Sequence, residues 1–305
     1  ADSRIMYVSE EGNDATGQVY SSTDFADPFN PTNEQAFATY DAAFQNTRDG
    51  YPDWILIKRG DTFYDSIGYD IRNGRSATEP FVVGAYGDSG LSPVMKTGND
   101  GAIGMCCGSL KWVAIFGINF YAHTRDPTSP EYLGGASGGA ISGYFGGNAR
   151  GILLEGLKLR FSNGNAISVD GSNDGFVIRR CVILNSYSDD GHSQGLYTYG
   201  MDIVLEENIF DHNGWYSQSG SGDVGQGTIF NHNTYMEDNP RTIMRNNIFM
   251  RPSSIGNKFT ANTGEASSKD ILVENNLYID GEVGMSIGGN VVGQYRFKNV
   301  TVREN

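Results

Sequence analysis

The sequence predicts an all-β fold in which short strands stack as the coils of a parallel β-solenoid. Three observations predict this fold: a recurring strand pattern, a charge that changes sign at each recurrence and a column of asparagines. The pattern is two alternating apolar residues, a polar pair and two more alternating apolar residues. It recurs from Trp112 to the C-terminus, with cores at 113–120, 152–159, 176–183, 203–210, 242–249, 271–278 and 295–302.

The first residue of each polar pair supplies the alternating charge. After Phe116 these residues are Glu155, Arg179, Glu206, Arg245, Glu274 and Lys298. Helix or hairpin preferences cannot produce this order, because the residues lie 24 to 39 positions apart. Parallel strands lie about 4.8 Å apart, so equivalent residues of stacked coils become neighbours, and opposite charges are favoured there.

Asn208, Asn247 and Asn276 occupy the same position after the polar pair. Inward asparagines at a corner can bond to one another and to corner backbone groups. The repeat length, in the twenties with long insertions at certain turns, is typical of a β-helix. In that architecture each coil buries its apolar face only by stacking on the next.

The N-terminal third predicts early strands near 5–8, 53–63 and 81–87, and one helix over about 32–48. Thr32 and Gln35 form a capping-box pattern, and Phe37, Tyr40 and Phe44 follow at helical spacing. A stack of coils exposes an apolar, unpaired end that has to be covered. We therefore predict an N-terminal capping helix.

Composition favours one elongated domain over 1–305, with regular coils over 112–305. Glycine is abundant, at 41 residues, the hydrophobic content is 38%, and no proline- or serine-rich linker divides the chain. No stretch approaches the roughly 18 apolar residues that span a bilayer, so no membrane span is predicted. The formal charge of −14 argues against a nucleic-acid partner, since phosphate binding needs clustered Lys and Arg.

The segment from Tyr51 to Thr97 resembles the entry coils of secreted bacterial right-handed parallel β-helix proteins. The runs 55–63 (Ile-Leu-Ile-Lys-Arg-Gly-Asp-Thr-Phe) and 83–87 (Val-Gly-Ala-Tyr-Gly) carry this resemblance, and 208–215 and 229–235 resemble a recurring subgroup. Proteins of this architecture are mostly polysaccharide lyases, pectin-type hydrolases, uronan epimerases or phage tail fibres. The resemblance implies a right-handed parallel β-helix and a polysaccharide or oligosaccharide partner.

The same resemblance implies a secreted, extracellular or periplasmic protein. The sequence opens with Ala1-Asp2-Ser3 directly before a strand, without a positively charged, apolar leader. A mature secreted protein whose signal has been removed looks like this, and so does a shortened chain. No complete catalytic signature of a named lyase or hydrolase family is present.

The coils over 185–260 hold most of the reactive residue types, including three of the four histidines. The longest insertions, over 121–150 and 214–226, flank them and predict the walls of a groove. Ser168, Tyr197, Tyr235 and Lys258 are predicted to align on successive coils. An outward column with a step of about 5 Å would result.

That column indicates β-elimination on a uronic acid sugar. The reaction needs a cation to neutralise the carboxylate, a base for the proton beside it and an acid for the leaving oxygen. The candidates are Lys258 or Arg251 for the cation, Tyr235 or His232 for the base, and Tyr197 or His192 for the acid. For substrate binding they are Trp215, Tyr216, Asp211 and His212. Trp215 and Tyr216 can stack on sugar rings or close a loop over the core, and His212 can instead be a structural hydrogen-bonding residue.

Carboxylates support a glycoside hydrolase as the alternative. Inverting hydrolases place two carboxylates about 6.5–9.5 Å apart. Asp189 and Asp190, with Asp211 or Asp223 one coil away, are the nearest match, although the signatures of pectin-type hydrolases are missing and adjacent aspartates are common in turns.

Calcium is a possible cofactor, with Asp223, Asp189 and Asp190 as candidate ligands. The turns 170–175 and 221–223 offer oxygen ligands of the kind calcium prefers.

A third hypothesis for the function is a noncatalytic glycan-binding or adhesion β-helix. The concentration of His, Tyr and Lys on one set of coils favours an enzyme.

Overall fold

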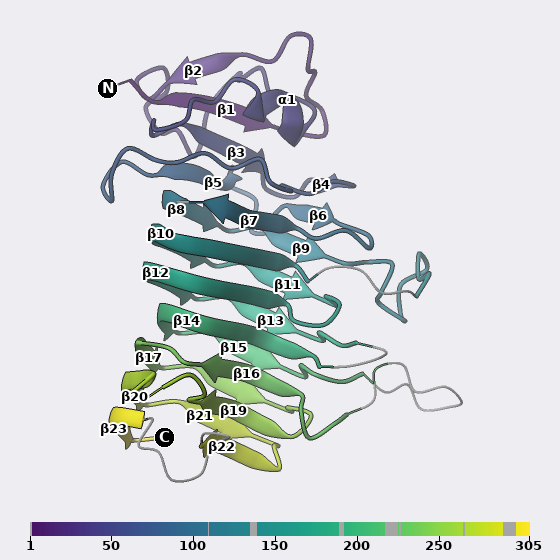
Figure 1. The fold of residues 1–305 in the computed structure, drawn as a ribbon. Helices are drawn as coiled ribbons and strands as arrows, with labels where there is room; N and C mark the ends of the chain where they lie inside the picture. Colours follow the sequence, from purple (N-terminus) through teal and green to yellow (C-terminus); the bar gives the residue numbers. More distant parts are fainter. Residues whose placement is uncertain are drawn as a thin grey trace.

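The computed structural model describes residues 2–108, 110–134, 139–188, 192–216, 225, 227–264, 266–288 and 297–305. The fold is all-β, with 48% of the chain in strands and 2% in helices. The strands form a 15-stranded and an 8-stranded sheet and are stacked along one axis from the N-terminal to the C-terminal end (Figure 1). This arrangement is consistent with the predicted β-helix.

Each round of the chain supplies strands to walls that we name A, B and C. Wall A contains the N-terminal parts of the long strands β10 (Ile141–Glu155), β12 (Ile167–Arg179) and β14 (Gln194–Glu206), together with β7 (Ile103–Gly108), β16 (His232–Glu237), β19 (Ile255–Thr260) and β22 (Val283–Ile287). The C-terminal parts of the long strands bend into wall B. There they join β1 (Arg4–Val8), β3 (Trp54–Lys58), β5 (Phe81–Tyr86), β8 (Lys111–Phe116), β17 (Arg241–Arg245), β20 (Ser268–Glu274) and β23 (Phe297–Arg303).

Wall C is the 8-stranded sheet of short strands. It contains β4 (Thr62–Phe63), β6 (Val94–Lys96), β9 (Asn119–Tyr121), β11 (Lys158–Arg160), β13 (Val182–Leu184), β15 (Ile209–Asp211), β18 (Ile248–Met250) and β21 (Leu277–Ile279). All strand pairs named in the three walls are parallel. The short strand β2 (Val19–Ser21) pairs antiparallel with β1 at the N-terminal edge.

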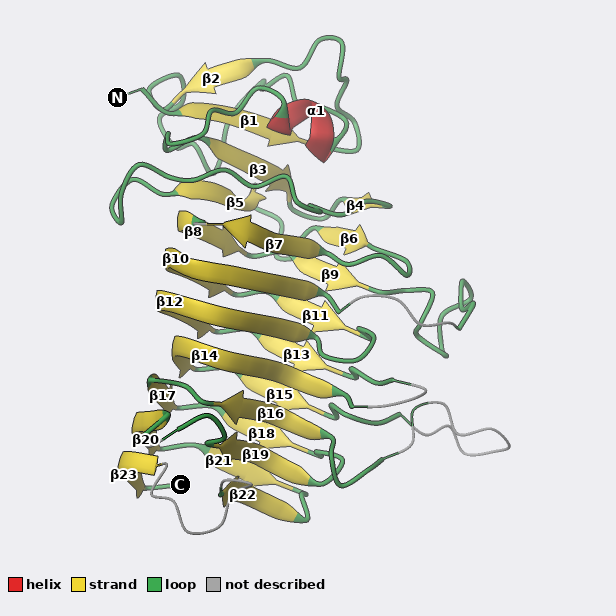
Figure 2. Ribbon diagram, in the orientation of Figure 1, coloured by secondary structure: helices red, strands yellow, loops and turns green. Residues whose placement is uncertain are grey.

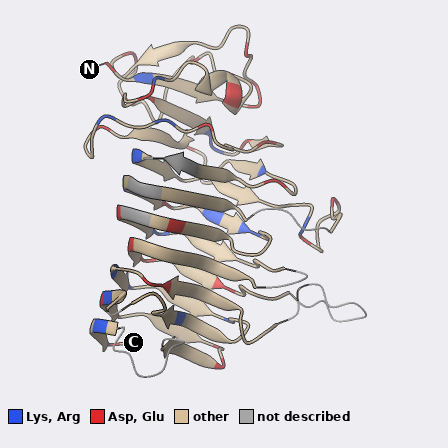
Figure 3. Cartoon of the chain, viewed as in Figure 1, with Lys and Arg blue, Asp and Glu red and all other residues tan. Residues whose placement is uncertain are grey.

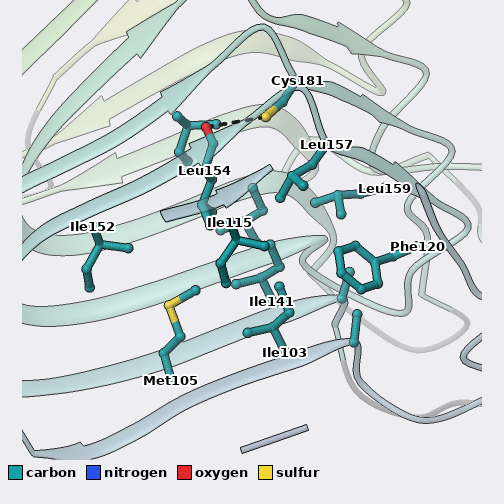
Figure 4. Close-up of a cluster of buried hydrophobic side chains, with 14 of the residues drawn as sticks. Ile103, Met105, Ile115, Phe120, Ile141, Ile152, Leu154, Leu157, Leu159 and Cys181 are labelled. Atoms are coloured by element: carbon teal, nitrogen blue, oxygen red, sulfur yellow. Dashed lines mark hydrogen bonds between the residues drawn. The ribbon is translucent and has the colours of Figure 1, made fainter. Parts of the chain in front are cut away.

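Alternating inward side chains fill the space between the walls. Ile103 and Ile141 come from wall A, Ile152 and Leu154 from wall B and Leu159 from wall C, and each is at most 1% exposed (Figure 4). Full burial of such a side chain contributes about 1.5–3 kcal/mol. Each coil therefore buries its apolar face against the coils above and below.

The alternating charges lie next to one another at the end of wall B, as predicted from Glu155 to Glu274. Arg179 Nη2 lies 2.7 Å from Glu155 Oε2, and Arg245 Nε lies 2.8 Å from Glu206 Oε1. These pairs are partly exposed, so each contributes at most about 1 kcal/mol. Their main effect is to favour one register of the coils over another.

The predicted position of Lys298 in this charge column is wrong. Lys298 pairs with Lys269, and Arg303 takes the position opposite Glu274, with Arg303 Nη2 2.6 Å from Glu274 Oε2. The physical reason is the asparagine two residues later, since Asn305 then continues the asparagine column. An asparagine also follows Glu274 at this spacing, whereas Val300 follows Lys298.

The asparagine column is confirmed and extends by one step. The Asn247 side-chain oxygen accepts hydrogen bonds from the Asn208 backbone and side-chain nitrogens, both at 2.9 Å. Asn276 receives the same two bonds from Asn247, and Asn305 receives them from Asn276. The corner N–H groups of Asn208 and Asn247 are thus satisfied inside the protein, where water cannot reach them.

The predicted helix over 32–48 is wrong in extent. The helix α1 spans Tyr40–Phe44, and the Oγ1 of Thr39 accepts its capping bond from the Ala42 nitrogen at 3.2 Å (Figure 2). Thr32 does not begin a helix, because Phe37 is extended and its nitrogen donates to the Tyr7 carbonyl at 2.8 Å. The short helix still packs Tyr40 and Phe44 into the N-terminal end of the core. No helix in the described part of the chain is long and apolar enough to cross a membrane.

Replacing Asn247 by leucine tests the asparagine column. The Asn247→Leu variant leaves the Asn208 N–H groups and the Leu205 carbonyl, which Asn247 Nδ2 contacts at 3.0 Å, without partners in the core. We expect a loss of about 3 kcal/mol in the free energy of unfolding, measured by urea denaturation. The exposed Asn30→Ala variant should stay within about 0.5 kcal/mol of the wild type. Equal midpoints for the two variants would contradict this role of the column.

Candidate functional site

The candidate site lies on the outer face of wall A. The strand pairings place Tyr197 beside Ser168, Tyr235 beside Tyr197, and Lys258 beside Tyr235. The predicted alignment of these four residues, which we call the Tyr-Lys column, is confirmed. Successive residues of a strand point to opposite faces, so the column faces outward while its neighbours, such as Thr198 and Phe259, are buried.

Four reactive side chains line one pocket of about 410 Å³ beside this column. They are His192, His232, Tyr235 and Lys258, and the apolar residues Ile229, Phe230 and Ile255 complete the lining. His232 and Tyr235 come from β16 and Lys258 from β19, whereas His192 and the pair Ile229 and Phe230 come from the turns that lead into wall A. The pocket thus combines reactive groups with a partly apolar surface, as ligand sites commonly do.

His232 is neutral at pH 7 in this site. The residue is 4% exposed, and burial lowers its pKa to about 4. A hydrogen bond to the Ile255 backbone opposes this shift, while the charges of Lys258 and His192 add to it. The Nδ1 atom is buried and has no hydrogen-bond partner among the described residues. A buried nitrogen without a partner is costly, and such groups gather at functional sites.

Tyr235 lies between its aromatic neighbours. Its ring centroid is 5.8 Å from that of His232 and 5.6 Å from that of Tyr197, both in edge-to-face arrangements. Within the described residues, no hydrogen bond engages the Tyr235 hydroxyl. The ring is therefore held in place while its hydroxyl remains available for a ligand.

Lys258 supplies the positive charge of the pocket. Its Nζ donates to the Ser286 Oγ at 3.2 Å, and burial lowers the pKa of this lysine. No carboxylate among the described residues forms an ion pair with it. An anionic ligand would therefore find an uncompensated cation here.

Tyr197 differs from Tyr235 because its hydroxyl is engaged. It donates to Glu237 Oε2 at 2.9 Å, and Asn262 Nδ2 donates to the other carboxylate oxygen at 2.6 Å. Burial, followed by the bond to Glu237, raises the pKa of Tyr197. Sequence reasoning missed Glu237, although its position two residues after Tyr235 places both on one face of β16.

Arg251 and the predicted binding residues lie elsewhere, at wall C and its following turns. Arg251 forms a bidentate pair with Asp211, with nitrogen–oxygen distances of 2.8 and 2.7 Å. The Trp215 Nε1 donates to the Arg251 carbonyl at 3.1 Å, and the Trp215 ring lies 4.3 Å from that of His212. Arg251 is thus engaged by a carboxylate and does not line the pocket.

His212 and Tyr216 belong to the same part of the molecule. The Nδ1 of His212 lies 2.7 Å from Asn185 Oδ1, which agrees with a structural hydrogen-bonding role, and burial lowers the pKa of this histidine. The Tyr216 ring packs against Phe161 and Tyr187, at centroid distances of 5.7 and 5.5 Å. These contacts join Tyr216 to a small hydrophobic cluster of Ala122, Phe161 and Tyr187, apart from the main core. Whether sugars also bind there stays a prediction.

The predicted metal ligands Asp189, Asp190 and Asp223 lie outside the described residues. Among the residues that are described, no group of three or more His, Cys, Asp or Glu side chains is placed to hold a metal ion. The predicted calcium turn over 170–175 is wrong as a turn, since these residues run within the strand β12. Gly171 and Gly175 adopt positive φ angles there and let the strand bend from wall A into wall B.

No family model matches the chain, and no curated protein matches it. Among solved structures, the chain is similar to an alginate lyase from Paenibacillus sp. str. FPU-7. The sequence identity is 15% and the TM-score 0.40, over 86% of this chain and 95% of the other. A likeness this distant carries no argument about activity, which has to rest on the pocket itself.

The lowered pKa of His232 predicts an acid-dependent loss of stability. The unfolded chain binds a proton below about pH 6.5, whereas the folded chain binds it only near pH 4. The contribution of neutral His232 is therefore complete above pH 6.5 and is lost as the pH falls to 4, by about 3 kcal/mol. Urea unfolding of the wild type and His232→Gln at pH 7 and pH 4.5 measures this. The variant should lose less stability on acidification, and equal losses would contradict the burial of a neutral imidazole.

Proposed function

We propose that the protein is a secreted or periplasmic polysaccharide lyase built as a right-handed parallel β-helix. It cleaves an acidic polysaccharide by β-elimination in the wall A pocket. One observation carries this proposal: His192, His232, Tyr235 and Lys258 line a single pocket. These residue types supply the base, the acid and the cation that the reaction requires.

Lys258 neutralises the carboxylate of the bound uronate. Removal of the proton beside the carboxylate places negative charge on it, and a nearby ammonium group stabilises that charge. Lys258 suits this role better than Arg251, because Arg251 is already paired with Asp211. Desolvation of Lys258 strengthens its interaction with an anion, since water screens the charge less.

Tyr235 is the base that removes the proton at the carbon beside the carboxylate. Its hydroxyl is not engaged by another described residue, and Lys258, which binds the carboxylate, is its pairing partner on the adjacent strand. The alternative base His232 has its free nitrogen buried. His232 is therefore better placed to hold the Tyr235 ring than to reach a substrate.

His192 donates a proton to the leaving oxygen. The carbon–oxygen bond then breaks, a carbon–carbon double bond forms in the ring that carries the carboxylate, and the departing sugar leaves with a hydroxyl group. His192 lines the pocket, whereas the proton of Tyr197 is directed to Glu237. We therefore favour His192 over Tyr197 as the acid.

Substitution of the base and the cation tests the mechanism. Tyr235→Phe and Lys258→Ala should each lower kcat by about 10²–10⁴-fold, because each removes a group needed in the transition state. The exposed residues Tyr51 and Lys269 offer matched controls, and Tyr51→Phe and Lys269→Ala should retain wild-type kcat. The measurement is the far-ultraviolet absorbance of the unsaturated product. Wild-type turnover in both pocket variants would disprove the proposed site.

The same assay separates the lyase from the other two classes. Alginate, pectate and glycosaminoglycans serve as substrates, and reducing ends are counted alongside absorbance. New reducing ends without absorbance would indicate a hydrolase that uses an aspartate pair. Binding without either product would indicate an adhesion module. Loss of activity with a chelator and its recovery with calcium would support the predicted calcium ligands.

A further inference from the structure

Wall A carries little positive charge for a surface that binds an acidic polysaccharide. Its described segments are 103–108, 141–146, 167–171, 194–200, 232–237, 255–260 and 283–287, and within them Lys258 is the sole lysine or arginine. Two carboxylates, Asp170 and Glu237, lie on the same wall. Asp170 belongs to β12, Glu237 to β16 and Lys258 to β19. In Figure 3 most of the ribbon of these strands is tan, the colour of residues other than Lys, Arg, Asp and Glu.

The two carboxylates belong to a second outward column, two residues along the strands from the Tyr-Lys column. Strand pairing places Tyr144 beside Asp170, Asp170 beside Tyr199, and Tyr199 beside Glu237. We call these four residues the acidic column. Tyr144 is 63% and Tyr199 36% exposed, so an exposed aromatic ring alternates with a carboxyl group along it.

The chemistry of this column suits sugars without charge. An ionised carboxylate only accepts hydrogen bonds, so it pairs with the hydroxyl and amide donors of a neutral or N-acylated sugar. Each oxygen of Glu237 already accepts one bond, from Tyr197 or Asn262, and has a second lone pair for such a donor. An exposed tyrosine ring offers an apolar face on which a sugar ring can stack. A second uronate beside Asp170 or Glu237 would instead place like charges a few ångströms apart on a partly desolvated surface.

We propose that the site takes a glycan in which single uronates alternate with uncharged sugars, in preference to a continuous polyuronate. The inference rests on the proposed function, in which Lys258 binds the carboxylate of the reacting ring. In a polyuronate the adjacent rings bring further carboxylates to a wall whose described segments hold no second lysine or arginine. In an alternating glycan those rings bring hydroxyl and amide groups to the acidic column.

Binding of size-matched oligosaccharides tests the preference. Fragments of hyaluronan and unsulfated chondroitin represent the alternating class, and fragments of alginate and pectate represent the polyuronates. Titration calorimetry with the Tyr235→Phe variant measures affinity without turnover, and wild-type product absorbance is recorded in parallel. We expect about tenfold tighter binding of the alternating class at low salt. The difference should narrow at high salt, which screens the repulsion.

Removal of the negative charges should relax the preference. Asp170→Asn and Glu237→Gln each keep an acceptor oxygen, so affinity for the alternating class should change by less than about twofold, while affinity for polyuronates should rise about fivefold. Asp88→Asn is the matched control, because it removes one exposed negative charge after β5, away from wall A. It should change neither affinity.

The outcomes separate this inference from the proposed function. Equal or tighter binding of polyuronates, or no gain in Asp170→Asn and Glu237→Gln, would overturn the substrate preference even if the enzyme is a lyase. A preference for alternating glycans without unsaturated product would support the inference and overturn the lyase mechanism. Binding of neither class would overturn both.

Discussion

The parallel register between successive coils is the constraint on which the rest of the structure depends. Each outward residue has its nearest neighbours one coil above and one coil below, so a site forms only if the coils stack in one alignment. A slip of one residue would turn Tyr235 inward and bring a buried neighbour to the surface. The asparagine column opposes such a slip, because each asparagine closes two hydrogen bonds with the next coil, as between Asn208 and Asn247.

The parts of the fold that follow from this register could be predicted from the sequence. Tyr197, Tyr235 and Lys258 were alignable because they lie on strands, where position within the repeat determines both the face and the neighbour. The error at Lys298 has the same origin. The charge pattern alone left two registers for the last strand, and the hydrogen bonds of Asn305 distinguish them.

The turns could not be predicted in this way, because their lengths differ from coil to coil and they carry no period. Asp211 ends β15 and Arg251 directly follows β18, its neighbour in wall C, so their ion pair forms where the strands give way to a turn and the repeat no longer specifies the position of a side chain. The prediction of a helix over 32–48 was wrong in extent for a related reason. The local pattern at Thr32 favours a helix, but tertiary hydrogen bonds to Tyr7 hold Phe37 in an extended form, and tertiary contacts override weak local preferences.

Burial and charge pairing distinguish Lys258, the charge that we propose to be reactive, from the structural charges of this chain. The corner residues, such as Glu206 and Arg245, are partly exposed and have an opposite charge one coil away, so their charges are compensated without a ligand. Lys258 is partly buried, its pKa is lowered by burial, and the side chain that it contacts is a neutral serine. His232 beside it is kept neutral, with a nitrogen that lacks a partner among the described residues. Burial thus destabilises the charged forms of both residues, and a bound carboxylate would offset that cost for Lys258. A carboxylate bound beside Lys258 would thus lower the electrostatic cost of burying that lysine, and this supports the proposal that the pocket is a binding site.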